Sequence, residues 1–149
     1  MNHEKYMQMA LGFAMQAFEQ GEVPIGCVII DEGGEKIGEG FNKRESSKNA
    51  TAHAEIEAIS QACAKIGDWR LDGCSLYVTL EPCPMCAGAI IMSRIEKVFY
   101  GAREQKTGSC GSVLNLFMEP YGHKVRLTGG VMEKECSELL SRFFGRLRG

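Results

Sequence analysis

The chain has 149 residues, of which 44% are hydrophobic and 24% charged, and its formal net charge is −2. This composition excludes a largely disordered chain and a wholly basic nucleic-acid coat, and the length predicts a single domain over 1–149. No apolar run approaches the roughly 18 residues of a membrane span, and the polar start lacks the features of a signal peptide, so we expect a cytoplasmic protein.

Hydrophobic periodicity predicts helices that alternate with strands. Gly21 ends the first apolar stripe of helical spacing, and Gly33-Gly34 marks a turn between two strands. Thr51 is the expected N-cap of the second helix. In chain order, we expect a helix over 5–20, strands over 26–30 and 36–41, a helix from Thr51 or Ala52 through 66, a strand over 75–80, a helix over 87–94, strands over 97–100 and 125–128, and a helix over 136–147.

The order of these elements predicts the fold class. Strands that alternate with helices are typical of a layered α/β domain. The hairpin formed by the first two strands makes the sheet mixed rather than purely parallel. The sequence contains no repeat, linker or low-complexity tract, which again favours one compact domain.

Two short segments carry the pattern H-x-E … P-C-x-x-C. His53 and Glu55 stand at the start of the second predicted helix, whereas Cys83 and Cys86 link a strand to the third. Zinc binds imidazole and thiolate ligands in a tetrahedron, and a helix N-terminus favours the thiolate form of cysteine. His53, Cys83 and Cys86 therefore predict a zinc site whose fourth position stays open for water, as a catalytic zinc requires.

Glu55 is the candidate general base of this site. It lies two residues after His53, so the two side chains would diverge on a regular helix. In the first turn of the helix, His53 can reach the metal while Glu55 reaches the water or the substrate.

Other interpretations of the cysteine pair stay open. A Cys-x-x-Cys between a strand and a helix is also typical of a redox dithiol, although that chemistry gives no role to the histidine or the glutamate. A purely structural zinc needs a fourth protein ligand, and we expect His3 in a frayed terminus and His123 in a solvated loop. The remaining cysteines are expected to fill apolar space: Cys27, Cys63, Cys74, Cys110 and Cys136.

These motifs resemble the zinc-dependent cytidine/deoxycytidylate deaminase superfamily, and within it the bacterial tRNA-specific adenosine deaminases. The resemblance runs in order along almost the whole chain. The matching segments are Val23-Pro24-Ile25-Gly26, Asn42, Thr51-Ala52-His53-Ala54-Glu55, Leu76 to Gly88, Ser93-Arg94-Ile95 and Lys106-Thr107-Gly108.

The resemblance implies a fold, a cofactor and a reaction. The fold is a three-layer α/β/α, cytidine-deaminase-like domain with a central mixed sheet of about five strands. One zinc ion per chain would be held by His53, Cys83 and Cys86. The implied reaction is hydrolytic deamination of the wobble adenosine of a tRNA anticodon to inosine, in which zinc-activated hydroxide attacks C6 of adenine. Glu55 would protonate N1 and carry a proton to the departing ammonia.

The resemblance also implies a tRNA anticodon stem-loop as partner and a homodimer as assembly. Asn42 aligns with a residue that hydrogen-bonds the flipped-out nucleotide, although the sequence alone favours a turn residue after a strand. Glu104 stands where the family often has an aspartate beside the anticodon, and a solvated loop acid is the alternative. Of the adjacent Phe143 and Phe144, we expect Phe143 in the core and Phe144 against an unpaired base.

The last residues of the chain are basic. Arg142, Arg146 and Arg148 lie in 141–149, a stretch without an acidic residue, which suits an RNA partner but is equally typical of a solvated helix face and tail. Two further functions stay open. One is a deaminase of a free base or nucleoside, such as guanine or cytosine, with the same zinc site. The other is a non-catalytic zinc module that binds RNA.

Overall fold

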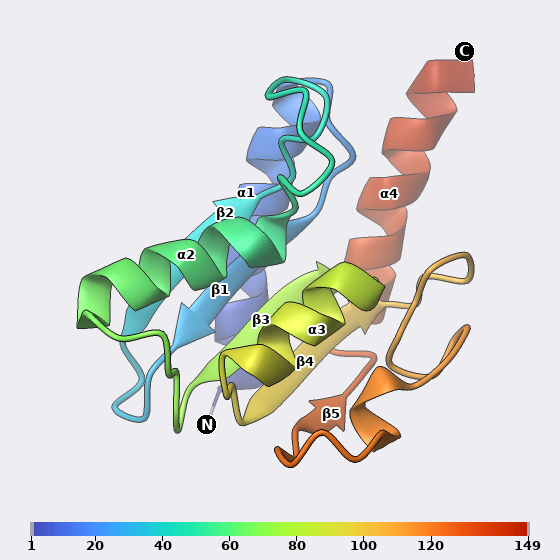
Figure 1. The fold of residues 1–149 in the computed structure, drawn as a ribbon. Helices are drawn as coiled ribbons and strands as arrows, with labels where there is room; N and C mark the ends of the chain where they lie inside the picture. The colour runs from blue at the N-terminus through green and yellow to red at the C-terminus, as the bar shows by residue number, and fades with distance from the viewer. Residues whose placement is uncertain (1, 149) are drawn as a thin grey trace.

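The computed structural model describes residues 2–148, with side chains for 2–146. This part of the chain forms a five-stranded sheet in the order β2-β1-β3-β4-β5 (Figure 1). None of its helices is both long and apolar enough to cross a membrane. The elements are α1 (His3–Glu19), β1 (Gly26–Ile30), β2 (Lys36–Phe41), α2 (Ala54–Ile66), β3 (Ser75–Leu80), α3 (Pro84–Met92), β4 (Lys97–Ala102), a 3-10 turn η1 (Leu116–Met118), β5 (Arg126–Thr128) and α4 (Glu133–Arg148).

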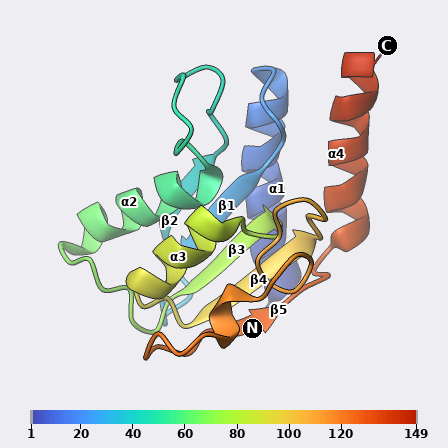
Figure 2. The same cartoon turned by 45° about the vertical axis from the view of Figure 1, so that its right-hand side comes forward.

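The sheet is mixed and lies between two layers of helices. β1 pairs antiparallel with β2 and β3, whereas β4 is parallel to both β3 and β5. Helices α2 and α3 cover one face, and α1 and α4 cover the other, as Figure 2 shows. This arrangement confirms the expected three-layer α/β/α fold with a mixed five-stranded sheet.

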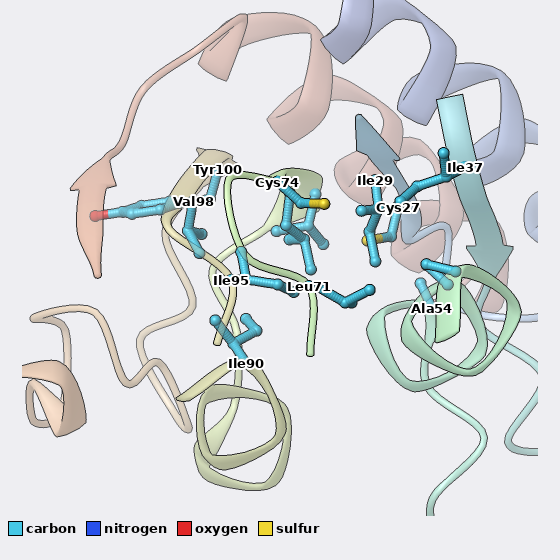
Figure 3. Close-up of a cluster of buried hydrophobic side chains, with 14 of the residues drawn as sticks. Cys27, Ile29, Ile37, Ala54, Leu71, Cys74, Ile90, Ile95, Val98 and Tyr100 are labelled. Carbon is cyan, nitrogen blue, oxygen red and sulfur yellow. The ribbon is translucent and has the colours of Figure 1, made fainter. Parts of the chain in front are cut away.

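Strand β1 is buried along its whole length because its alternate side chains enter two different cores. Cys27 and Ile29 enter the core beneath α2, whereas Val28 and Ile30 enter the core beneath α1. Figure 3 shows the first of these cores, in which the aliphatic side chains of the strands meet Ala54 of α2. A continuous apolar run is the expected sequence of a strand that is covered on both faces.

Two glycines of β2 determine how closely α2 lies on the sheet. A Cβ at Gly38 would stand 2.4 Å from the Ala58 carbonyl oxygen, and one at Gly40 would stand 2.5 Å from the Ala54 carbonyl oxygen. Only a residue without a side chain fits at such a separation from backbone. The glycines therefore fix the position of the first turn of α2, where the candidate site begins.

Most predicted elements are confirmed, with differences at their ends. Strands β1, β2 and β3 have the predicted bounds. Strand β4 continues past its predicted end to Ala102, because Ala102 pairs with Leu80 of β3. Helix α3 begins at Pro84 and α4 at Glu133, each ahead of the apolar stripe from which it was predicted.

Two local predictions are wrong. The N-cap of α2 is His53 rather than Thr51, whose hydroxyl donates to Asn49 Oδ1 at 2.8 Å within the preceding turn. His3 is not frayed but forms the first residue of α1, and its Nδ1 lies 2.7 Å from the Tyr77 hydroxyl. The Thr51 contact is a local turn between residues two apart, whereas the contact of His3 with Tyr77 exists only in the folded chain and leaves no local sequence signal.

The cysteines outside the metal motif lie mainly in the interior. Cys27, Cys74, Cys110 and Cys136 are buried free thiols, as expected of apolar fillers. Cys63 is only half-buried, near the end of α2.

Candidate active site

The N-termini of α2 and α3 bring the two halves of the motif together. His53 is the N-cap of α2 and Cys83 is the N-cap of α3, and both have extended backbone. Neither side chain caps its own helix, so the imidazole and the thiol turn toward each other instead. Pro84 occupies the first turn of α3, where its fixed φ suits the start of a helix.

Three ligand atoms meet at this point. His53 Nδ1 lies 3.6 Å from Cys83 Sγ and 3.6 Å from Cys86 Sγ, and all three atoms lie within 4.8 Å of one another. In a tetrahedral zinc site, bond lengths of about 2.3 Å to sulfur and about 2.0 Å to nitrogen place the nitrogen and sulfur about 3.5 Å apart. The spacing and the donor chemistry both fit zinc. Among the described side chains, no fourth histidine, cysteine or acid completes the group.

Hydrogen bonding within the group favours an ionised cysteine. A hydrogen bond from the Cys86 thiol and, to a lesser degree, one from the His53 ring together lower the pKa of Cys83 to about 4. The contact between Cys86 and Cys83 raises the pKa of Cys86, and the separate hydrogen bond between His53 and Cys83 raises the pKa of His53. Cys83 is therefore a thiolate at neutral pH, which is the form that binds metals.

Glu55 lies beside the three ligand atoms in the first turn of α2. Its side chain is 4% exposed, and burial raises its pKa to about 7. The negative charge of Cys83 adds to this rise. A carboxyl group with a pKa near neutrality can both accept and donate a proton, which is the requirement for a general acid and base.

A cavity of about 320 Å³ opens onto this group. It contains every substrate-contacting residue that the sequence predicted: Asn42 on one wall, Glu104 on the opposite loop and Phe144 on α4. Apolar, basic and other polar side chains complete the lining: Val23, Ile25, Leu80, Arg44, Lys106, Glu81 and Thr107. A second hollow, at the edge strand β2, contains none of the predicted site residues.

The predicted substrate residues differ in how they are held. The Asn42 side-chain amide donates to the Val23 carbonyl at 3.3 Å, and its Oδ1 accepts from the Arg44 N–H at 3.3 Å, so Asn42 organises a turn as well as lining the cavity. Glu104 accepts the Lys106 N–H at 3.0 Å within its own loop. The Glu104 side chain thus both closes a turn of its loop and lines the cavity.

The two phenylalanines of α4 separate as expected. Phe143 is 7% exposed and packs against Phe18 of α1, whereas Phe144 is 42% exposed and lines the cavity. Arg142 and Arg146 lie over the Phe18 ring, 5.5 and 5.1 Å from its centroid. The side chain of Arg148, the third predicted basic residue, lies outside the described residues.

His123 lies in the loop before β5, as predicted, but it is not freely solvated. It is half-buried, and its Nε2 lies 2.8 Å from the Ile95 carbonyl oxygen. The ring therefore ties this loop to the segment between α3 and β4.

The sequence analysis missed two buried carboxylates that hold the loops around the cavity. Glu81 accepts N–H groups from Glu104, Cys110 and Ser112 at 3.1, 2.9 and 3.1 Å, and it also accepts the Ser112 hydroxyl. Glu22 holds the 43–52 loop in the same way, by accepting the N–H groups of Glu45 and Ser46. An acid directly after an apolar strand is an available signal for Glu81, but its partners come from a loop that no local pattern connects to it.

One family model, that of the MafB19-like deaminases, matches residues 1–148. The tRNA-specific adenosine deaminase of Bacillus subtilis (strain 168) is 49% identical over 146 residues, which cover 97% of this chain and 90% of that protein. The chain belongs to the tRNA-specific adenosine deaminase family. Like other members of the tRNA-specific adenosine deaminase family, it is a hydrolase that acts on a C–N bond.

Solved structures support membership of the tRNA-specific adenosine deaminase family. A structure from a study of A-to-I editing by tRNA:A34 deaminases at the wobble position of transfer RNA has a TM-score of 0.86 and 41% identity, and the match covers 91% of this chain and 98% of that one. A guanine deaminase from Bacillus subtilis is 34% identical, with a TM-score of 0.66 over 100% of this chain and 96% of that one. A deaminase of another base thus has the same fold. The assignment of the substrate therefore rests on the sequence identity to the relatives and on the residues that line the cavity.

Proposed function

We propose that this chain hydrolyses the wobble adenosine of a tRNA anticodon to inosine. The observation that carries the proposal is the shared cavity, in which His53, Cys83 and Glu55 face Asn42 and Phe144. The relatives at 44–49% identity, which are named tRNA-specific adenosine deaminases, support the same proposal. With a tRNA as substrate, we also propose a cytoplasmic location for the protein.

One zinc ion per chain would be held by His53, Cys83 and Cys86, whose spacing and donor types fit it. When bound, zinc supplies a Lewis acid that makes water a stronger nucleophile. Glu55 takes a proton from the attacking water and delivers it to N1 of adenine, and it later moves the remaining proton from the new C6 hydroxyl to the amino group, which leaves as ammonia while the C6 carbonyl forms. Burial of Glu55 keeps bulk water from competing for these protons.

The rest of the cavity would receive a nucleotide that is turned out of the anticodon loop. Asn42 presents an amide to the nucleotide, and Glu104 borders it from the opposite loop. Phe144 offers an exposed ring on which an unpaired base can stack. The cations of Arg44 and Lys106 lie on the same lining, where backbone phosphates would need them.

The assay that tests this function offers the purified protein an anticodon stem-loop with a wobble adenosine, in parallel with free adenosine, guanine and cytosine. We expect inosine in the stem-loop and little product from the free compounds. A matched stem-loop with the adenosine moved one position controls for specificity. Turnover of free guanine or cytosine alone would instead show a free-base deaminase, and zinc binding without any turnover would show a non-catalytic module.

We also propose that the chain is one deaminase domain and assembles as a homodimer. One sheet spans the described residues, which supports a single domain. Large apolar side chains stand exposed on α3 and on the segment beside it: Met92, Val113, Leu114 and Met118, the last 80% exposed. An exposed apolar patch of this kind favours a protein interface. Sedimentation equilibrium should give twice the chain mass, and Met118→Glu should shift the equilibrium to the monomer.

A further inference from the structure

We propose that Glu22 is a positioning residue for deamination, whose buried carboxylate holds the 43–52 loop and thereby one wall of the cavity. The inference rests on the proposed function for its activity readout, although the anchoring of the loop is tested independently of it. Glu22 does not line the cavity and touches none of the ligand atoms. Its role is therefore exerted through the loop.

The carboxylate of Glu22 is committed to the backbone of one turn. The residue is 1% exposed, and its two oxygens accept the N–H groups of Glu45 and Ser46 at 3.0 and 2.5 Å. Burial acts to raise the pKa of Glu22, but these donors outweigh it and leave the pKa below its ordinary value. The group is an anion at neutral pH, and hydrogen bonds to an anion are about twice as strong as neutral ones.

Glu22 is itself fixed by the end of α1. Its own N–H donates to the Ala17 carbonyl at 2.9 Å, which closes the last turn of the helix. The carboxylate therefore ties the loop to the end of α1, whereas the turns inside the loop are closed by its own hydrogen bonds, such as those from the Ser47 and Asn49 N–H groups to the Lys43 and Arg44 carbonyls. Residues 44–51 are all exposed, so no apolar packing holds this stretch in place.

The loop that Glu22 holds leads directly into the cavity. At its base the Lys43 N–H donates to the Ala52 carbonyl at 2.9 Å, one residue before His53. On its other side, Asn42 and Arg44 line the cavity, and Asn42 is bonded to the Val23 carbonyl next to Glu22. A shift of the Glu45–Ser46 turn would therefore displace two groups that face the substrate.

Glu22→Gln tests the inference, because it keeps the size of the side chain but replaces one acceptor oxygen by a donor and removes the charge. The matched control is Glu19→Gln, an exposed glutamate at the end of the same helix. Each protein is measured for zinc content, thermal unfolding, kcat and KM on the wobble-adenosine stem-loop, and the rate of tryptic cleavage after Arg44 and Lys48.

We expect Glu22→Gln to bind zinc normally, to be cleaved in the loop at least about tenfold faster, and to raise KM about tenfold with a smaller change in kcat. Glu19→Gln should match the unsubstituted protein in all four measurements. Unchanged cleavage in the loop would overturn the anchoring role, whatever the activity. Faster cleavage with an unchanged KM would overturn the positioning role.

A second variant tests the inference if Glu22→Gln folds poorly. Ser46→Pro removes the N–H that donates to Glu22 from the loop side, at an exposed position. The same rise in cleavage and KM is expected, and its absence would contradict the inference. If the unsubstituted protein does not deaminate the stem-loop, the proposed function fails, whereas the cleavage assay still decides whether Glu22 anchors the loop.

Discussion

The role proposed for Glu55 depends on its position in the helix as much as on its carboxyl group. It is the second residue of α2, and the N-cap just before it is the metal-site histidine His53. In a regular helix these two side chains would point apart, but the extended backbone of His53 lets both face the cavity. The proposed metal ligand and the proposed proton carrier are thus only two residues apart in the sequence.

Glu55→Gln should abolish deamination and leave metal binding intact. The amide keeps the shape of the side chain but cannot carry a proton, and general acid–base catalysis contributes about 10²–10⁴-fold to rate. Inosine formation and zinc content per chain measure the two effects. Glu57→Gln, on the same helix and outside the cavity, is the control and should keep full activity. Loss of zinc from Glu55→Gln would mean that Glu55 holds the metal site together.

Phe144→Ala should weaken binding of the stem-loop by about 1–3 kcal/mol, the usual contribution of one base stacked on an aromatic ring. The ring is 42% exposed, so its removal should change the free energy of unfolding little. Phe144→Tyr keeps the stacking face and should bind normally. Fluorescence anisotropy with a labelled stem-loop checks both variants, and equal affinity for all three proteins would show that no base stacks there.

The sequence indicated these residues well because the chemistry of the metal motif depends on spacing. His53, Glu55, Cys83 and Cys86 were predicted from residue type and position alone, and the structure brings them together. Glu22 was not predicted, because a buried glutamate is recognisable only when its partners are known. Those partners are backbone N–H groups of a loop more than twenty residues away, which carry no side-chain signature.

At the scale of the elements, the contact between α2 and β2 aligns half of the site. Gly38 and Gly40 let the helix backbone approach the strand, and small alanines of α2 face them. α3 begins at Pro84, directly after β3, and lies against α2 and η1. The spacing of the candidate ligands therefore depends on how closely α2 packs on β2 and on how α2 and α3 lie against each other.

Gly40→Ala should disturb the site from a distance. The new methyl group would stand 2.5 Å from the Ala54 carbonyl oxygen, so the first turn of α2 must move. Overpacking of this kind costs about 1–3 kcal/mol, and we expect zinc affinity to fall with stability. Gly12→Ala, in α1 with open space around it, should be neutral or stabilise by up to about 1 kcal/mol. Urea unfolding and zinc titration distinguish the two, and equal behaviour would contradict the packing argument.

The elements themselves were largely predictable, whereas their ends were not. β1 and β3 match the sequence prediction because apolar runs bounded by turns specify buried strands, and β2 matches because the Gly33-Gly34 turn predicts the second arm of a hairpin. The start of α2 was misplaced, since its N-cap uses no side-chain hydrogen bond and the rule for Ser and Thr caps does not apply. β4 was predicted too short, because its last pair depends on a strand far along the chain.

At the scale of the whole molecule, the sheet is covered on both faces and its central strands take part in both cores. Damage to either helical layer therefore exposes the same strands. This coupling supports the proposal of one domain, and calorimetry of the full chain should then show a single unfolding transition.

Stability should depend on pH in part through Glu22. Its pKa in the folded chain is below the ordinary value of about 4.3, so its ionised form stabilises the fold above that pH, and the stabilisation is lost as the pH falls through the lower, folded pKa. We expect Glu22→Gln to unfold about 1–3 kcal/mol more easily at pH near 7, and the gap to narrow toward pH of about 3. Urea unfolding across this range, with Glu19→Gln as control, measures the gap. A gap that stays constant with pH would exclude an ionic origin.

Glu22 and Glu81 each hold a loop by accepting hydrogen bonds from its backbone N–H groups. Almost every amino acid would offer the same N–H group at these loop positions. An anchorage of this type depends little on the side chains of the loops, except at Ser112, whose hydroxyl also donates to Glu81, and at Gly108, where a Cβ would stand 2.5 Å from the Glu81 carboxyl carbon. Mutation can thus change the loop surface that contacts a nucleic acid, while the loop backbone that positions the reactive groups stays in place. Libraries that seek new substrates for this scaffold should randomise the outward positions of both loops and leave the two acids untouched.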